Sequence, residues 1–466
     1  DVYKRQGWEG EGREMNPDSD TIAALSTPPG ESAIAVVRAS GPLCSEIARG
    51  AFRLGADPRP RFSARGTYRS LSGAVLDEAM FVFFRGPSSY TGEDMLEVGC
   101  HGNPFIVQRV LEDMFARGAR AASHGEFTRR AFENGKLDLS QAEAVMLMVA
   151  ARSEKSLEAA RRQLGGELSK RINSMCDALV LALAHIEAHI DFSEEDLPPE
   201  SYDEPVRLLE VVVRDAARLA ESSRYGAVLR DGLNVSIIGE PNVGKSSLMN
   251  RLLGRERAIV SPSAGTTRDF IVERASIGGC CVNLADTAGL RESPDEIERE
   301  GVRRAVEMAR EADLKLFVVD SSSPSDGAAV LALPGIDPAD TIIVLNKCDL
   351  PRALPAGAFS GFETAEVSCL EDTGVGRLRG LISDFISNRA ITSSFDDVLV
   401  SARHSSLVSE ALASARSALE MIGRGAPAEL VSSDVRAALE SLGEIVGRGD
   451  REEVLDRIFS TFCIGK

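Results

Sequence analysis

The segment Gly239–Ser246 has residue types and spacing that suit the binding of a phosphate chain. It reads G-x-x-x-x-G-K-S, in which the glycines let backbone N–H groups approach the α- and β-phosphates without a Cβ in the way. Lys245 is expected to reach the β- and γ-phosphates, and the Ser246 hydroxyl is expected to bind Mg²⁺. A strand-like run, 233–238, precedes the loop, and helical apolar spacing follows it. The loop predicts a nucleotide site with contacts from Asn242, Val243, Gly244, Lys245, Ser246 and Ser247.

Two segments farther along the chain have the residues to select the base. Asn346–Asp349 reads N-K-x-D and follows a strand-like run, 341–345. The Asp349 carboxylate can accept both N–H groups of a guanine edge, whereas adenine would present an acceptor and leave the carboxylate unpaired. Ser368 and Cys369 also follow a strand and suit a loop that supports the guanine O6 through a backbone N–H. The predicted guanine contacts are Asn346, Lys347, Asp349 and Ser368.

Two more segments are placed for the γ-phosphate and its metal ion. Asp286–Gly289 reads D-T-A-G at the end of a strand-like run, so that Asp286 can meet Mg²⁺ through a water molecule and the Gly289 N–H can meet the γ-phosphate. The segment 264–269 has the pattern of a first switch, with Thr267 placed to complete the Mg²⁺ coordination. Five elements in this order predict a GTPase.

Leu290 departs from the Ras-like pattern at the position that governs hydrolysis. Ras-like proteins place a water-orienting Gln directly after D-x-x-G, and this chain has Leu290 there. Because leucine cannot orient water, hydrolysis needs another group, and the acidic helix start at 295–298 supplies candidates. A monovalent cation held by Asn242 and the loop 261–266 could replace the positive charge of an arginine finger.

The composition bounds the class of protein. With 466 residues the chain should hold about three domains. Its net charge of −18 argues against a protein that coats nucleic acid non-specifically, but leaves room for RNA contact through a local basic face. Eight cysteines without a C-x-x-C pair fit reduced thiols in a cytosol. The longest apolar runs, such as 144–151, are too short to span a membrane.

The patterning predicts an α+β unit followed by helices. Residues 1–14 are polar and aperiodic, so we expect a disordered extension or an artefact, with Met15 as the true start. Strands are predicted at 21–25, 33–38, 64–69, 79–84 and 94–99, with helices at 44–51 and 104–117. The segment Gly125–Lys136 mixes charge with aromatic residues ahead of a long helical stretch, and its composition favours a solvated first turn.

Helical patterns lie on both sides of the nucleotide-binding segment. One runs from Leu139 to about Ile190 with breaks near Gly165 and Gly166, and another covers 203–224. Two amphipathic helices, 405–421 and 432–446, follow the insert. This order suggests one helical domain into which the nucleotide domain is inserted. The apolar chain end, 458–466, is expected to be either docked or an active arm.

Three histidines leave alternatives open. His101 lies beside Gly102 in a polar loop, where it could be catalytic, although a structural hydrogen bond is the commoner role. His185 and His189 are one helical turn apart with Asp191 nearby, which could mimic a metal pair. The spacing does not match H-E-x-x-H and specifies no third ligand, so the pattern favours ordinary helix residues.

Several separate motifs make the chain resemble the MnmE (TrmE) family of tRNA-modification GTPases over essentially its whole length from Met15. The segments that carry the resemblance are Thr27–Gly30, Ser89–Asp94, Gly125–Thr128, Asn134–Leu139, Pro241–Ser247, Gly265–Asp269 and Phe462–Lys466. The resemblance implies a multidomain α+β and α/β protein. Its expected parts are an N-terminal α+β domain (15–133) that dimerises and binds folate, a helical domain (134–230 and 394–466, ending in a C-terminal arm), and an inserted Ras-like P-loop GTPase domain (231–393).

The resemblance also implies roles for individual residues. A formyl-tetrahydrofolate would be contacted by Arg38, Glu97, Lys136 and Lys466. Mg²⁺ would be held by Ser246 and Thr267, and K⁺ by Asn242, Ser261, Ser263 and Thr266. Glu298 would act on the attacking water through a bridging water, with Arg291 nearby. Cys463 matches the family's C-terminal cysteine, either as a nucleophile or as an apolar packing residue.

The family's activity gives the functional expectation. Its members are cytoplasmic, K⁺-stimulated GTPases that work as homodimers and in a heterotetramer with an FAD-dependent partner, MnmG (GidA). Together they install an aminomethyl-type group on C5 of the wobble uridine, position 34, of tRNA. The alternative reading is a regulatory or ribosome-assembly GTPase whose N-terminal domain is a ligand-binding module.

The sequence departs from the family pattern at a few positions, and none of these changes contradicts the expected function. His124 stands where Pro is usual, and Met146–Met148 replaces a common Asp-Leu-Ile. Ser261 replaces Thr, and a carbonyl ligand would survive that change. Cys369 replaces Ala at a position where the contact comes from the backbone.

Overall fold

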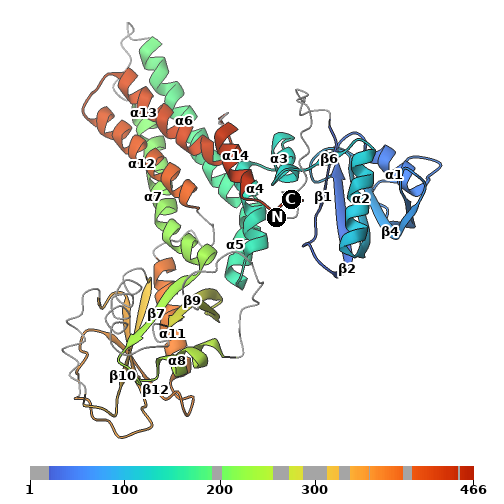
Figure 1. Ribbon diagram of the computed structural model, residues 1–466. Helices are drawn as coiled ribbons and strands as arrows, with labels where there is room; N and C mark the ends of the chain where they lie inside the picture. The colour runs from blue at the N-terminus through green and yellow to red at the C-terminus, as the bar shows by residue number, and fades with distance from the viewer. Residues whose placement is uncertain are drawn as a thin grey trace, which may run out of the picture. The chain divides into compact units, whose positions relative to one another are not determined.

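The computed structural model describes residues 20–191, 202–254, 272–286, 312–324, 336–355, 357–391, 401–449 and 452–465 (Figure 1). The chain divides into two compact units after Glu143 and after Gly449, so that the terminal segment joins the N-terminal unit. The predicted extension 1–14 lies outside the described residues. Among the described residues, no helix is both long and apolar enough to cross a membrane.

The N-terminal unit is built on a six-stranded sheet with the order β3-β4-β5-β2-β1-β6. The strands are β1 (Ile22–Leu25), β2 (Ser32–Ser40), β3 (Ala64–Arg69), β4 (Val75–Phe84), β5 (Met95–Gly102) and β6 (Arg120–Ala121). All pairs are antiparallel except β1 with β6. Along β2, Val37 and Ala39 are fully buried while Arg38 between them points to the opposite face. The predicted strands are present, and β4 and β5 extend beyond the expected bounds.

Two helices cover the buried face of this sheet, as Figure 1 shows. They are α1 (Cys44–Phe52) and α2 (Pro104–Ala116). Asn103 begins α2 by accepting the Phe105 and Ile106 N–H groups, and Pro104 occupies the first turn, where it loses no helical hydrogen bond. The core between helices and sheet includes stacked Phe52 and Phe81, with ring centroids 4.1 Å apart.

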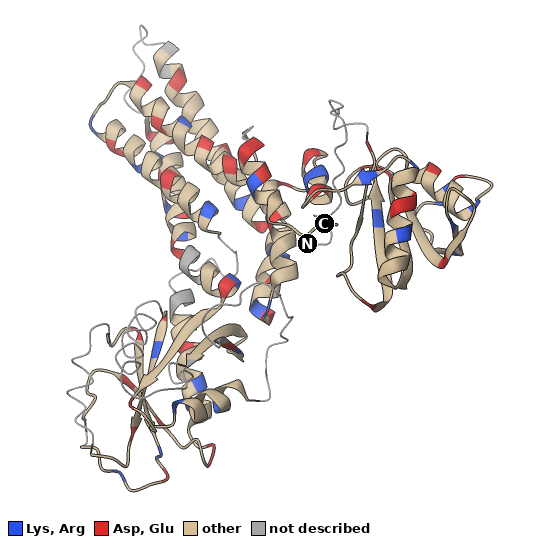
Figure 2. Cartoon of the chain, viewed as in Figure 1, with Lys and Arg blue, Asp and Glu red and all other residues tan. Residues whose placement is uncertain are grey.

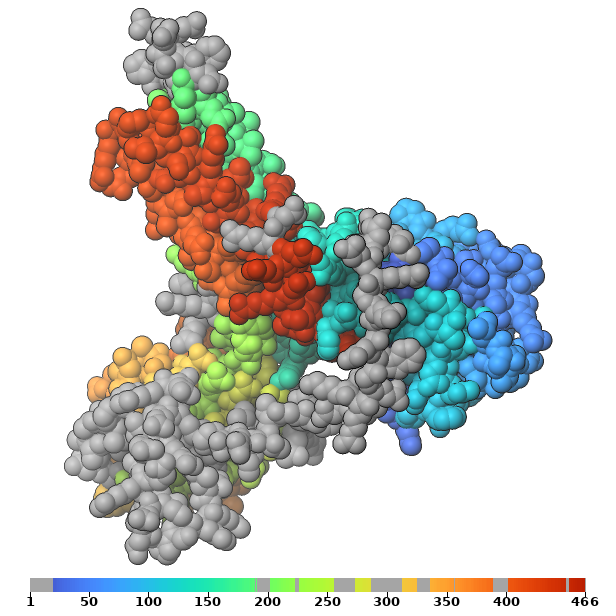
Figure 3. All heavy atoms as spheres, turned by 45° about the horizontal axis from the view of Figure 1, so that its top comes forward, coloured from blue at the N-terminus to red at the C-terminus, as the bar shows by residue number. Residues whose placement is uncertain are grey.

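The segment after β6 corrects a prediction. Instead of a solvated first turn it forms a separate, largely buried helix, α3 (Glu126–Glu133), in which Phe127 and Thr128 are fully buried and Arg130 is 5% exposed. The terminal helix α14 (Glu452–Ser460) packs beside α3, and the two lie together in Figure 3. The apolar chain end is therefore docked, as the first of the two expected alternatives proposed.

The second unit contains a helical bundle. Its helices are α5 (Glu154–Leu164), α6 (Glu167–Asp191), α7 (Asp203–Asp231), α12 (Ala402–Gly423) and α13 (Ala428–Ile445); α4 (Leu139–Ala150) leads into it. An apolar core joins α6, α7, α12 and α13 across the sequence gap. The predicted helical run has an additional break, because Ser153 caps α5 through the Ser156 N–H at 3.2 Å. Helix α7 also continues seven residues beyond its predicted end, Arg224.

The second unit also contains a six-stranded sheet with the order β12-β11-β10-β7-β9-β8. Its strands are β7 (Leu233–Gly239), β8 (Val272–Ile277), β9 (Cys280–Asp286), β10 (Leu314–Asp320), β11 (Thr341–Asn346) and β12 (Glu363–Val367). Every pair is parallel except β8 with β9. The central strands β10 and β11 are buried almost throughout, as expected of parallel strands covered on both faces. Helices α8 (Lys245–Leu253) and α11 (Val375–Ile391) share the core of this sheet.

Candidate functional site

The phosphate loop joins the carboxyl end of β7 to the first turn of α8, and its glycines are required there. Gly239 and Gly244 have φ of 151° and 102°, in the region that favours glycine. A Cβ on Gly239 would lie 2.3 Å from the Val318 carbonyl oxygen, and one on Gly244 would lie 2.2 Å from Asn346 Nδ2. Lys245 Nζ donates to the carbonyl oxygens of Gly239 and Glu240 at 2.9 and 2.8 Å. This cradle, with the N–H groups of α8 at its base, fits a phosphate chain.

Asn346, the first residue of the N-K-x-D motif, joins the phosphate loop to the loop that contains Ser368 and Cys369. It is 2% exposed at the end of β11. Its Nδ2 donates to the Val243 carbonyl oxygen at 2.7 Å, and its Oδ1 accepts the Cys369 N–H at 3.3 Å. Asn346 is therefore a structural bridge between two loops, a role that the motif did not indicate.

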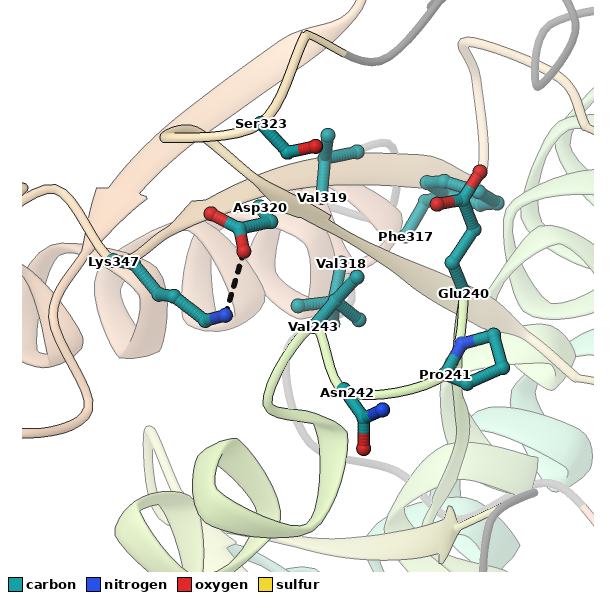
Figure 4. A pocket seen from close by; sticks show the side chains of 10 residues that line it. All are labelled: Glu240, Pro241, Asn242, Val243, Phe317, Val318, Val319, Asp320, Ser323 and Lys347. Atoms are coloured by element: carbon teal, nitrogen blue, oxygen red, sulfur yellow. Dashed lines mark hydrogen bonds and ion pairs between the residues drawn. The ribbon is translucent and has the colours of Figure 1, made fainter. Parts of the chain in front are cut away.

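Lys347 lies in a small cavity beside the phosphate loop. The cavity measures about 140 Å³, and Figure 4 shows the Lys347 side chain directed at Asp320, with Nζ 2.6 Å from Oδ2. Burial alone would raise the pKa of Asp320, but hydrogen bonds from Lys347 and Ser322 outweigh burial and lower the pKa below its usual value. Asp320 thus stays ionised and fixes the lysine of the N-K-x-D motif, although sequence reasoning did not single it out.

The remaining base-selecting residues occupy adjacent loops. Asp349 is exposed two residues beyond Lys347. Ser368 is fully buried, and its hydroxyl accepts the Glu371 N–H at 3.2 Å. Arg251 on α8 holds this loop by donating to the carbonyl oxygens of Cys369 and Leu370. The fold therefore gathers the phosphate loop, the N-K-x-D motif and the Ser368 loop at one edge of the parallel sheet.

Part of the predicted catalytic set lies outside the described residues. Those positions are Ser261, Ser263, Thr266, Thr267, Gly289, Arg291 and Glu298; of Asp286 only the backbone, at the end of β9, is described. Of the predicted cation ligands, Ser246 and Asn242 are described, and both are exposed. Asn242 has φ of 63°, a conformation that Asn tolerates well, and its amide points away from Asp320 in Figure 4. These oxygen donors fit Mg²⁺ and K⁺.

A second candidate site lies on the face of the N-terminal sheet opposite α1 and α2. Arg38 on β2 faces Glu97 on β5, with Nη2 2.8 Å from Oε1. The Arg38 guanidinium also lies 5.8 Å from the ring centroids of Tyr90 and Phe127. Lys136, the third predicted residue, is exposed and donates to the Pro87 carbonyl oxygen at 3.0 Å. The fourth, Lys466, lies outside the described residues.

The C-terminal arm reaches this second site. The Gly465 carbonyl oxygen lies 3.5 Å from Arg38 Nη1 and accepts the Ser26 hydroxyl at 3.2 Å. His124 Nδ1 lies 2.8 Å from the Phe462 carbonyl oxygen, so this departure from the family pattern helps to hold the arm. Cys463 is exposed between these contacts. The Glu97 carboxylate and the Arg38 guanidinium fit the polar edge of a heterocycle, and an exposed lysine such as Lys136 suits an anionic tail.

A buried charge cluster supports the second site, and sequence reasoning missed it. Arg130 on α3 contacts Asp20, Glu93 and Glu126 at 2.6, 3.1 and 3.1 Å. Arg120 bonds Asp20 and Glu126, each at 2.5 Å. Burial opposes ionisation of Asp20 and Glu126, but hydrogen bonds from the two arginines lower the pKa of both carboxyls below their usual values. The only sequence signal was the mixed charge of Gly125–Lys136.

The structure distinguishes between the alternative roles of His101 but not between those of His185 and His189. His101 Nδ1 lies 2.7 Å from Asp77 Oδ1, and the His101 N–H donates to Asp77 Oδ2 at 2.8 Å. This pairing supports the structural role. His185 is exposed on α6, whereas the side chains of His189 and Asp191 lie outside the described residues, so the metal pair stays a hypothesis.

Comparisons with known proteins identify the family of this chain. The family description "MnmE helical domain" matches residues 139–463, and "GTP-binding protein TrmE N-terminus" matches residues 21–136. The tRNA modification GTPase MnmE of Opitutus terrae is 48% identical over 454 residues, covering 97% of this chain and all of that protein. The MnmE of Aquifex aeolicus is 41% identical over 448 residues, covering 96% of this chain and all of that protein. This chain therefore belongs to the MnmE (TrmE) family of tRNA modification GTPases.

Proposed function

We propose that this protein is a K⁺-stimulated GTPase that, with the FAD-dependent protein MnmG (GidA), modifies C5 of the wobble uridine 34 of tRNAs. The one-carbon unit comes from 5-formyltetrahydrofolate or a related folate. The protein acts in the cytoplasm as a homodimer and forms a heterotetramer with its partner. The observation that carries the proposal is the presence, in one chain, of a guanine-nucleotide loop system and a separate charged site reached by the C-terminal arm.

The GTPase half of the proposal assigns roles around the phosphate loop. Lys245 and the N–H groups at the start of α8 bind the phosphates, and Asp349 selects guanine. Ser246 and Thr267 would hold Mg²⁺, which supplies charge neutralisation at the β- and γ-phosphates. The residues that would hold K⁺, in place of an arginine finger, are Asn242, Ser261, Ser263 and Thr266. Glu298 orients the attacking water through a second water, with Arg291 nearby, because Leu290 cannot do so.

The modification half assigns roles to the second site. Glu97 accepts hydrogen bonds from the amino-pyrimidine edge of the folate, and Arg38 holds Glu97 in place. Lys136 and Lys466 bind the carboxylates of the folate tail. Cys463 is exposed on the arm, two residues before Gly465, whose carbonyl oxygen contacts Arg38. We assign its thiol to the reacting uridine. The docked arm thus brings the terminal residues to the folate.

A reconstituted reaction tests the proposal. The chain, its FAD-containing partner, unmodified tRNA, Mg²⁺, GTP, the folate, an amine as nitrogen source and a reductant for the flavin are combined in KCl or NaCl of equal ionic strength. Nucleosides are then analysed by mass spectrometry while phosphate release reports GTP turnover. We expect modified uridine only in the complete mixture, and GTP turnover at least about tenfold slower in NaCl, because an arginine finger is worth about 10³–10⁵ in kcat. Equal turnover in both salts would contradict the cation assignment.

Matched variants separate the two halves. Lys136→Ala should abolish folate binding in calorimetry and reduce modification without changing GTP turnover, whereas Lys170→Ala, which removes an exposed lysine from α6, should change neither. If GTP is hydrolysed but no folate binds and no tRNA is modified, the regulatory or ribosome-assembly GTPase is the better description.

A further inference from the structure

The loop that joins α1 to β3 is strongly basic although the chain carries a net charge of −18. The loop, 53–63, contains Arg53, Arg59 and Arg61 and one acidic residue, Asp57; Arg49 at the end of α1 and Arg65 at the start of β3 flank it. Acidic residues, red in Figure 2, are instead spread along the long helices. The positive charges in and beside this loop repel one another, so binding of an anionic partner would relieve that repulsion.

Contacts with the end of β4 hold this loop and add a further arginine. The Arg61 N–H donates to the Phe83 carbonyl oxygen at 2.7 Å, and the Arg61 guanidinium donates to the Ser88 carbonyl oxygen at 2.9 Å. Arg85, just beyond β4, lies 3.5 Å from Asp57. The loop 57–62 and the segment 83–88 therefore form one surface.

The acidic residue in this surface is already shared. Asp57 lies 3.6 Å from Arg49 as well as 3.5 Å from Arg85. Within the described residues, neither Arg59 nor Arg61 has a carboxylate within 4.0 Å. The positive charge of this surface is therefore only partly neutralised by the protein.

An aromatic ring is exposed among these arginines. Phe62 is 52% exposed, and the Arg59 guanidinium lies 5.4 Å from the centroid of its ring. Such a cation–π contact orients the ring at the surface. The exposed ring surface then remains available for stacking by another planar group. Arginines that bind phosphate and an aromatic ring that stacks on a base are the combination used by proteins that bind unpaired nucleotides.

We infer that Arg59, Arg61, Phe62 and Arg85, named the arginine–phenylalanine patch, form a tRNA-binding surface. The arginines bind backbone phosphates, and Phe62 stacks on an unpaired base of a tRNA loop. An acidic peptide would use the charges but not the ring, so the geometry favours RNA. This inference rests on the proposed function for the identity of the RNA as tRNA.

Binding of fluorescent tRNA to the full chain tests the patch. Affinity is measured by anisotropy at several KCl concentrations for the wild type, Arg59→Ala, Phe62→Ala and the double variant. Phe62→Ala should weaken binding about tenfold. Arg59→Ala should reduce the slope of log K against log salt by about one. The control is Phe105→Ala with Arg109→Ala, which removes an exposed Phe and an exposed Arg from α2 and should leave both quantities unchanged. Hydrogen exchange of β3 and β4 peptides should match the wild type in every variant, which establishes correct folding of the N-terminal unit, and GTP turnover should also be unchanged.

The same binding measurement with other anionic probes distinguishes failure of this inference from failure of the proposed function. They are an unrelated single-stranded RNA, poly-glutamate and vesicles of anionic lipid. If tRNA binds equally to the wild type and the double variant, the patch is wrong while the proposed substrate stands. If the wild type binds the unrelated RNA through the patch but binds no tRNA, the patch is an RNA surface and the proposed function fails. Patch-dependent binding of poly-glutamate or vesicles alone, or no binding to any probe, overturns the inference.

Discussion

The two six-stranded sheets position their candidate sites by different means. In the parallel sheet the site lies on loops beyond the strand ends, where backbone carbonyls and one buried amide, Asn346, fix the loops. In the N-terminal sheet, Arg38 and Glu97 sit on neighbouring strands, and a buried charge cluster centred on Arg130 ties α3 to the sheet. Substitutions in the nucleotide site should therefore have only local structural effects, whereas substitutions in the charge cluster should destabilise the whole N-terminal unit.

The largest expected effect comes from Arg130→Met. Removing this 5% exposed cation leaves Asp20 and Glu126 with Arg120, and leaves Glu93 with the Ser40 hydroxyl but with no cation among the described residues. The loss should destabilise the unit by about 3–5 kcal/mol. Hydrogen exchange of α3 peptides measures the loss. The control is Arg129→Met on the same helix, whose more exposed ion pairs with Glu133 and Asp456 should contribute less than about 1 kcal/mol each.

The same cluster gives a pH dependence with a defined sign. The pKa values of Asp20 and Glu126 are lowered from 3.8 and 4.5, so their stabilisation is fully present above those values and is lost as the pH falls through the lowered pKa values. Circular dichroism between pH 7 and 3 should show this acid loss in the wild type and less of it in Arg130→Met. GTP turnover of Arg130→Met at pH 7 should be unchanged, and a parallel loss of turnover would contradict the separation of the two sites.

A smaller and local effect is expected for Asn346→Ala. The substitution leaves the Val243 carbonyl oxygen and the Cys369 N–H without their buried partner, at a cost of about 1–3 kcal/mol. Titration with a fluorescent guanine nucleotide should show an affinity about 10–100-fold weaker, with no change in α3 hydrogen exchange. Asn250→Ala, which removes an exposed Asn from α8, serves as the control. Affinity within twofold of the wild type would mean that the two loops are held by other contacts.

The smallest effect is expected for Asp320→Asn. This change removes a partly exposed ion pair with Lys347, which is worth about 1 kcal/mol or less. Guanine-nucleotide affinity in the same titration should fall by no more than about fivefold, and Asp337→Asn should have no effect. A loss above about 100-fold would indicate that Asp320 contacts the nucleotide itself rather than positioning Lys347.

The nucleotide loops could be predicted from the sequence because each is a contiguous motif between a strand and a helix. The phosphate loop, with β7 before it and α8 after it, lies where the pattern placed it. The α5 boundary was missed because apolar residues continue through Ala151, although Ser153 and Ser156 form a capping pair. Helix α3 was predicted wrongly because composition shows charge but not which carboxylates will surround it.

The sequence by itself determined where the nucleotide loops lie and predicted their chemistry, since Lys245, Asn346 and Asp349 belong to short motifs whose backbone geometry is local. Only the tertiary structure decided that Asn346 bridges two loops, that Asp320 holds Lys347, and that the terminal arm reaches Arg38. These contacts join residues that are far apart in the chain, such as Arg38 and Gly465. No local pattern encodes such pairs, because burial and charge complementarity between distant segments are established only when the chain folds.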